Sequence, residues 1–122
     1  MIGYVTLGTN DLEKAKRFYD TVLAEMGGKR AMGFERMQLW GNGAGSPMIG
    51  VCTPYDEKPA SVGNGVMPAF AASSRAQVDK VHATAMANGA SDEGSPGLRG
   101  ETFYGAYFRD LDGNKLCVFH TG

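Results

Sequence analysis

One pattern is written twice in this chain, and this repeat constrains the fold more than any other feature. A strand-like segment, a turn and a helix-like segment follow one another in each half, and equivalent positions such as Ala15 and Val78 stand 63 residues apart. In both helix-like segments mostly apolar residues recur at i, i+3, i+4 and i+7, which is the spacing of one helix face. These residues are Ala15, Phe18, Tyr19 and Val22 in the first half, and Val78, Val81, His82 and Ala85 in the second. A strand–helix–strands unit needs a partner to bury its sheet, and a tandem copy supplies one.

The pattern predicts the order βαβββ, a linker, and βαβββ again. The predicted strands cover about residues 2–8, 29–33, 35–40, 47–53, 66–72, 90–92, 103–109 and 115–120. Residues 95–100 are expected to form a loop because of their proline and glycines. We expect a single domain over residues 1–122, with module 1 at about 1–55, a linker at about 56–65 and module 2 at about 66–122.

The two predicted helices have recognisable ends. The first covers about residues 12–26, with Thr9, Asn10 and Asp11 as candidate N-caps, and the second ends near residue 88 after a cap at Ser73 or Ser74. In the last hairpin, the segment 112–114 supplies residues that tolerate a positive φ. The spacing of the acidic residues there starts like a calcium loop, but the later ligands are missing, so a hairpin turn is predicted.

Composition excludes several classes of protein. The chain has 122 residues, of which 43% are hydrophobic and 20% charged, as in a globular protein. The net charge of −1 gives no basic field for nucleic acid. No apolar run approaches the roughly 20 residues of a membrane span, and the N-terminus leads directly into a strand pattern without a signal peptide. The two cysteines give no disulfide framework, so we expect a cytoplasmic protein. Together, these observations predict neither nucleic-acid nor membrane partners.

Several segments, taken in order, carry a family resemblance. They are Tyr4-Val5-Thr6-Leu7, Asn10-Asp11-Leu12-Glu13-Lys14-Ala15, Arg17-Phe18-Tyr19, Gly63-Asn64-Gly65, and Tyr107-Phe108-Arg109-Asp110-Leu111-Asp112-Gly113-Asn114-Lys115-Leu116. With them the chain resembles the vicinal oxygen chelate superfamily, which includes the glyoxalase I, bleomycin-resistance and extradiol-dioxygenase families. Leu111 stands where the superfamily usually has proline. The second half also resembles a subgroup with Asp-Glu-Gly, Pro-Gly and Leu-Arg, here Asp92-Glu93-Gly94, Pro96-Gly97 and Leu98-Arg99.

The resemblance implies an α+β fold in which two tandem βαβββ modules form a curved eight-stranded sheet around a cavity. Metal-dependent members hold a divalent ion there, at positions that correspond to Tyr4, Gly50 (or Met48), Met67 and Cys117. None of these is His, Glu or Asp, and hard or borderline cations prefer imidazole and carboxylate ligands. The expectation is therefore that the metal site is lost and that no cofactor is bound.

The same resemblance, combined with strand alternation, implies a set of ligand-binding residues in the cavity. They are Tyr4, Met67, Ala69, Cys117 and Phe119, with polar reach from Arg99, Tyr104 and Tyr107. Each has a plain structural alternative, such as a packed phenol, an inert buried thiol or a solvated loop arginine. The facing of Trp40, the only tryptophan, stays open.

The sequence leaves three functions open. The first and preferred one is a metal-free protein that binds a small molecule, like the bleomycin-resistance branch. The second is a metal-independent enzyme that uses Tyr4, Arg99 or Cys117, and the third is a glyoxalase-like or dioxygenase-like metal enzyme with relocated ligands. The resemblance also implies a homodimer, because many two-module members pair in this way and sheet edges need covering.

Overall fold

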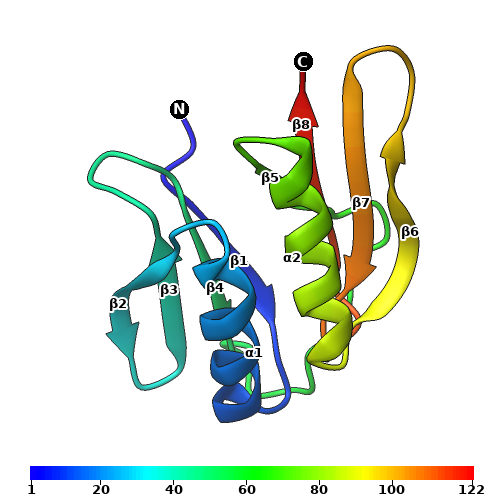
Figure 1. The fold of residues 1–122 in the computed structure, drawn as a ribbon. Coiled ribbons are helices and arrows are strands. Elements are labelled where there is room, and N and C mark those ends of the chain that lie inside the picture. Colours follow the sequence, from blue (N-terminus) through cyan, green and yellow to red (C-terminus); the bar gives the residue numbers. More distant parts are fainter. The chain divides into compact units, whose positions relative to one another are not determined.

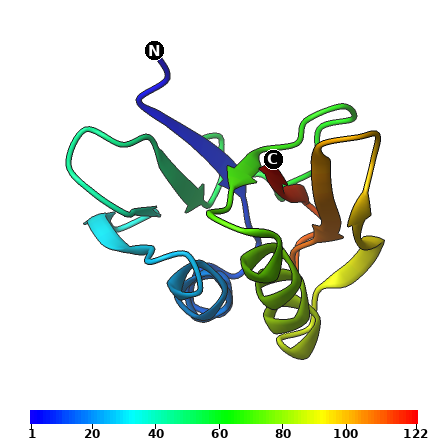
Figure 2. The same cartoon turned by 45° about the horizontal axis from the view of Figure 1, so that its top comes forward.

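The computed structural model describes all residues from 1 to 122, and it confirms an α+β protein made of two βαβββ modules (Figures 1 and 2). Contacts divide the chain into two compact units, Met1–Val62 and Gly63–Gly122. The eight strands lie in two sheets of four, one in each unit. The first residues of the helices α1 (Leu12–Ala24) and α2 (Arg75–Ala87) are 63 positions apart, and so are their last residues. The repeat in the sequence is therefore also a repeat in the structure.

Unit 1 consists of one helix and a four-stranded sheet in the order β1-β4-β3-β2. Its strands are β1 (Tyr4–Gly8), β2 (Lys29–Phe34), β3 (Met37–Gly41) and β4 (Met48–Cys52). β1 pairs with β4 in parallel, and the other two pairings are antiparallel. The predicted apolar stripe of α1 is buried against this sheet, where the Tyr19 ring lies 5.5 Å from the Trp40 ring. Trp40 therefore belongs to the core on the α1 side of the sheet.

Helix α1 is fixed at both ends by local contacts. Asp11 is the N-cap, and its Oδ1 accepts a hydrogen bond from the Lys14 backbone N–H. At the other end Gly27 has a φ of 74°, a backbone conformation that favours glycine, and the N–H of Gly28 donates to the Leu23 carbonyl. The helix therefore ends at Ala24, two residues earlier than predicted.

Unit 2 repeats the arrangement with the strand order β5-β8-β7-β6. Its strands are β5 (Ala69–Ala71), β6 (Ser91–Leu98), β7 (Phe103–Arg109) and β8 (Lys115–Thr121). Ser74 caps α2, as one of the two predicted candidates, by accepting from the Gln77 N–H. The predicted stripe of α2 is buried in this unit's core together with residues of β7 and β8. Neither 13-residue helix is long and apolar enough to cross a membrane.

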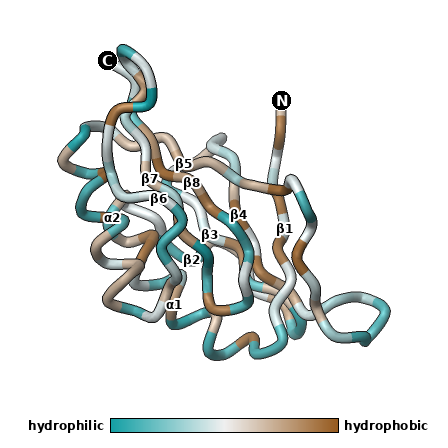
Figure 3. Tube along the Cα trace, turned by 90° about the vertical axis from the view of Figure 1, so that its right-hand side faces the viewer, coloured by the Kyte–Doolittle hydropathy of each residue, from teal (hydrophilic) through white to brown (hydrophobic).

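Two strands of unit 2 differ from the prediction. β6 runs through Pro96 and Gly97, where a loop was expected, because it is the edge strand of its sheet and its pairing with β7 is interrupted by two register shifts. Proline and glycine are tolerated at such edges and bulges. β5 begins only at Ala69, three residues later than predicted, since Pro68 has no N–H to donate to the ladder. Along both units, short hydrophobic and hydrophilic stretches alternate (Figure 3).

The turn between β7 and β8 confirms the predicted hairpin. The carboxylate of Asp110 is buried, and its Oδ1 accepts from the backbone N–H groups of Asp112 and Asn114. Its Oδ2 accepts from the Asn114 side-chain amide. The acidic group is thus used to close the turn.

Candidate ligand-binding site

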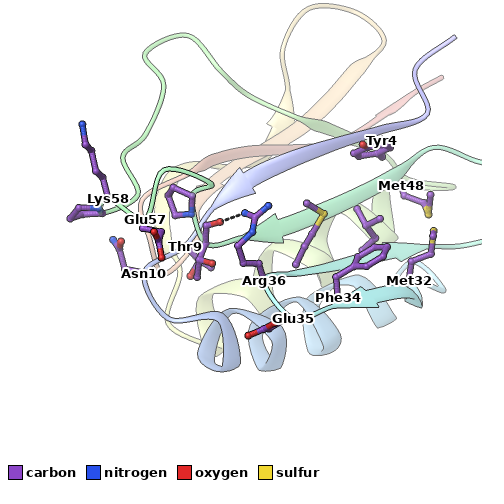
Figure 4. Close-up of a pocket in the computed structure, with 15 residues that line it drawn as sticks. Tyr4, Thr9, Asn10, Met32, Phe34, Glu35, Arg36, Met48, Glu57 and Lys58 are labelled. Atoms are coloured by element: carbon purple, nitrogen blue, oxygen red, sulfur yellow. Dashed lines mark hydrogen bonds between the residues drawn. The ribbon is translucent and has the colours of Figure 1, made fainter.

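A cavity of about 1020 Å³ lies on the face of the unit 1 sheet that is turned away from α1 (Figure 4). Strand alternation explains its position, because Val5, Ile49 and Trp40 share the α1 face and the residues next to them point the other way. The cavity is lined by Tyr4, Thr9, Asn10, Met32, Phe34, Glu35, Arg36, Met37, Leu39, Met48, Thr53, Pro54, Glu57, Lys58 and Pro59. All of these residues belong to unit 1.

The sheet forms the apolar part of the lining. Two register pairs, Tyr4 with Met48 and Phe34 with Met37, place an aromatic ring beside a flexible thioether. The Tyr4 side chain is 58% exposed and Phe34 is 56% exposed, an unusual exposure for large hydrophobic residues. Methionine side chains adapt to ligands of irregular shape, and exposed apolar groups gathered at one place mark a binding surface.

The segment after β4 forms the polar wall of the same cavity. It is held to unit 1 by Asn10, whose Oδ1 accepts from the Ala60 N–H at 2.7 Å and whose Nδ2 donates to the Ala60 carbonyl at 3.5 Å. Gly8 lets this segment approach closely, since a Cβ at that position would lie 3.0 Å from the Cβ of Ala60. Within the wall Glu57 has a φ of 63°, which is strained for a residue other than glycine. Asn10 thus positions the wall and does not cap α1.

Arg36 lies between the two parts of the lining. It occupies the turn between β2 and β3, and Figure 4 shows its guanidinium between the Asn10, Glu57 and Lys58 end and the Phe34, Met32 and Met48 end. Its Nη1 donates to the Thr53 carbonyl at 2.6 Å, and its guanidinium carbon lies 5.3 Å from the centroid of the Tyr55 ring. These contacts fix the position of the half-buried cation, which forms no ion pair with a carboxylate.

Four of the residues predicted to bind a ligand share one face of the unit 2 sheet. Cys117 pairs with Ala69 on one side and with Tyr107 on the other, and Phe119 follows two positions later on the same face. The Phe119 ring stacks on Phe103 at 5.2 Å with an interplanar angle of 9°. This face is therefore aromatic, with small residues on β5.

Cys117 lies beneath Tyr107 and is only 1% exposed. Burial raises the pKa of the Cys117 thiol, while its hydrogen bond with the Tyr107 hydroxyl acts in the opposite direction. Burial also raises the pKa of Tyr107. At neutral pH the pair is therefore a neutral thiol and a neutral phenol.

Two cations approach the ring of Tyr107. The guanidinium carbon of Arg99 lies 5.5 Å and the Lys115 Nζ 5.7 Å from the ring centroid. Arg99 also donates to the carbonyls of Gly97, Gly105 and Ser95. The guanidinium of Arg99 thus ties the edge strand to the rest of its sheet.

The remaining predicted residues lie elsewhere. Tyr104 lies on the opposite face from Tyr107, toward α2, and its hydroxyl donates to Asp79 of α2 at 2.6 Å, which raises the pKa of Tyr104. Met67 precedes β5 and is exposed. Tyr4 is the one predicted residue that lines the unit 1 cavity.

The four positions that correspond to metal ligands in the resemblance do not fit a divalent cation. In unit 1 they hold a phenol, Tyr4, with either Met48 or Gly50. In unit 2 they hold the thioether of Met67 and the protonated thiol of Cys117, whereas divalent metals of this kind prefer imidazole and carboxylate. No group of three or more His, Cys, Asp or Glu side chains is arranged to hold a metal ion elsewhere in the chain.

Most residues of the unit 1 cavity were not predicted from the sequence. The alternation of Met32 and Phe34 within a strand is a signal that could have indicated an apolar outer face. Arg36 gave no such signal, because its role depends on Thr53 and Tyr55, which reach it only in the folded unit.

Comparison with known proteins agrees with this architecture of two βαβββ modules. The sequence matches the Glyoxalase/Bleomycin resistance protein/Dioxygenase superfamily over residues 1–118. The chain therefore belongs to that superfamily. A search of curated proteins found no match.

Solved structures give the same result. A glyoxalase/bleomycin resistance protein from Albidiferax ferrireducens T118 is 38% identical, with a TM-score of 0.91 over 100% of this chain and 99% of that chain. A glyoxalase/bleomycin resistance protein/dioxygenase family enzyme from Burkholderia phytofirmans PsJN is 18% identical, with a TM-score of 0.79 over 98% of each chain. A lactoylglutathione lyase from Agrobacterium tumefaciens is 21% identical, with a TM-score of 0.71 over 98% of this chain and 92% of that chain. The last two similarities concern the fold alone.

Proposed function

We propose that this chain binds a small molecule in the unit 1 cavity without the help of a metal ion. The observation that carries the proposal is the cavity itself, whose volume of about 1020 Å³ is slightly above the roughly 300–1,000 Å³ that is usual for ligand sites. Its lining combines adaptable thioethers and aromatic rings with a few polar groups. This composition is typical of sites that hold a small organic ligand.

Metal-dependent chemistry is the weaker alternative because of the donors at the four inherited positions. A phenol, thioethers and a protonated thiol bind Mn²⁺, Fe²⁺, Ni²⁺ or Zn²⁺ poorly. The loss of the metal site is thus part of this proposal. A metal-independent enzyme that uses Cys117 as a nucleophile is also disfavoured, because the thiol is buried and its pKa is raised.

The assembly and location belong to the same proposal. We propose a cytoplasmic homodimer, supported by the superfamily to which the chain belongs and by the exposed edge strand β2, which has an unpaired side.

A pair of tryptophan variants tests the location of the site. Met48→Trp fills the unit 1 cavity, whereas Ala69→Trp adds the same side chain to the exposed face of unit 2. The probe is 2-naphthamide, a neutral aromatic amide, and the measurement is the ligand-induced shift in melting temperature together with the dissociation constant. Met48→Trp is expected to weaken binding at least about tenfold, since the indole occupies the ligand's space. Ala69→Trp is expected to bind as the wild type does, and the reverse result would place the site on unit 2.

A further inference from the structure

The lining of the unit 1 cavity is divided by polarity along its length. Figure 4 shows Tyr4, Met32, Phe34 and Met48 at one end and Asn10, Glu57 and Lys58 at the other. A ligand that fills both ends must therefore have an apolar body and a polar group. The positive charge of Arg36, between the two ends, favours a negative charge on that polar group.

Arg36 has the properties of a prepared anion-binding group. A guanidinium has five N–H donors, and only Nη1 is used in a hydrogen bond within the protein, to the Thr53 carbonyl. The contact with the Tyr55 ring orients the guanidinium plane, so less side-chain freedom is lost when an anion binds. Because the charge is half-buried and has no carboxylate partner, a ligand carboxylate would bind it more tightly than it would bind a solvated arginine.

The other charged residues of the lining do not cancel this preference. Glu35, Glu57 and Lys58 are all exposed to solvent, and water and salt screen exposed charges strongly. Figure 4 also shows the Glu35 carboxylate directed away from the other labelled side chains. Arg36 is thus the charge with most influence on a ligand inside the cavity.

We propose that the unit 1 cavity selects amphipathic anions: an aromatic or alkyl body packs on Tyr4, Phe34 and the methionines, and a carboxylate or similar oxyanion binds the guanidinium of Arg36. This inference rests on the proposed function and names the class of its ligand. The neutral amide used above and its carboxylate counterpart have the same ring and nearly the same shape, so they separate the two claims.

The test compares 2-naphthoate with 2-naphthamide in titrations followed by ¹H–¹⁵N correlation spectra at pH 7.5 and 0.1 M salt. In the wild type the carboxylate is expected to bind about tenfold more tightly than the amide, as a charge-assisted hydrogen bond allows. In Arg36→Gln the two dissociation constants should become equal. The matched control, Arg17→Gln, removes one positive charge from the exposed surface of α1 and should keep the tenfold preference.

Each other outcome has a definite meaning. Equal affinities for the two probes in the wild type would overturn the inference and leave the proposed function in place. If neither probe causes saturable shifts of unit 1 amides, both the inference and the proposed function are overturned. If Arg36→Gln does not fold, Arg36→Lys decides, because lysine can still donate to Thr53 but lacks the planar fork. An unchanged tenfold preference in Arg36→Lys would show that a positive charge at position 36 is sufficient for the preference. An unchanged preference in a folded Arg36→Gln would overturn the role of Arg36.

Discussion

The carboxylate of Asp20 joins three parts of unit 1. Its Oδ1 accepts from Arg30 Nε and from Trp40 Nε1, both at 2.9 Å, and its Oδ2 accepts from Arg30 Nη2 at 2.9 Å. The hydrogen bonds from Arg30 on β2 are the main reason that the pKa of Asp20 is lowered from its ordinary value of 3.8, and Trp40 contributes in the same direction. Asp20 thus links α1 to two strands of the sheet that carries the cavity.

A lowered pKa makes the stability of unit 1 depend on pH in a defined direction. The contribution of ionised Asp20 is present above its unfolded-state pKa and is lost as the pH falls through the lower folded-state pKa. Asp20→Asn removes the charge but keeps an acceptor for Trp40. We expect its free energy of unfolding at pH 7 to be lower than the wild-type value by less than about 1 kcal/mol, because the carboxylate is partly solvated.

The measurement is urea unfolding between pH 7 and pH 2.5, followed by the fluorescence of Trp40. The difference between wild type and Asp20→Asn should shrink below pH 4, as Asp20 becomes protonated and its contribution is lost. A difference that stays constant over this range would contradict the assigned role of the Asp20 charge.

At the scale of elements, Asn10 and Asp11 are neighbours with separate tasks. Asp11 caps α1, whereas Asn10 holds the wall of the cavity through Ala60. Asn10→Ala is expected to speed hydrogen exchange of the Ala60 amide at least about tenfold, because that amide loses its acceptor, while the exchange of α1 stays unchanged. Asp11→Ala should show the opposite pattern and lower the free energy of unfolding by about 1 kcal/mol. Equal exchange of Ala60 in both variants would show that the wall does not depend on Asn10.

The helices and strands also show which parts of the fold could be predicted from the sequence. Helix stripes, N-cap residues and the turn at Asp110 are local signals, and they predicted α1, α2 and the last hairpin. β6 was predicted too short because its edge position, which tolerates Pro96, follows from pairing with β7 and is not visible locally.

The site was harder to predict than the fold. Tyr4 was predicted to bind a ligand and lies in the lining of the unit 1 cavity. Arg36 was not predicted, because it acts through Thr53 and Tyr55, which lie about 17 residues or more further along the chain. Tyr104 and Tyr107 were both predicted to reach the cavity because the sequence alone does not decide which of the two faces α2; the register of β7 puts Tyr104 there.

At the scale of the whole molecule, the proposed homodimer makes a simple prediction. Sedimentation equilibrium at micromolar concentration should give a mass of twice the 13.0 kDa chain. The edge strand β2 supplies the physical reason, since its outer backbone groups have no partner within the unit 1 sheet. A single species of 13.0 kDa over the whole concentration range would reject the dimer.

The most direct test of the account is a titration of metal-stripped protein with 2-naphthamide, followed by ¹H–¹⁵N correlation spectra. After dialysis against a chelator, we expect saturable shifts confined to amides of β1, β2, β3 and β4, of the lining residues 9, 10, 35 and 36, and of residues 53–59. The dissociation constant should stay the same after stoichiometric Zn²⁺, Mn²⁺ or Ni²⁺ is added. Saturable binding that occurs only after a metal is added, or shifts confined to unit 2, would contradict metal-free binding in the unit 1 cavity.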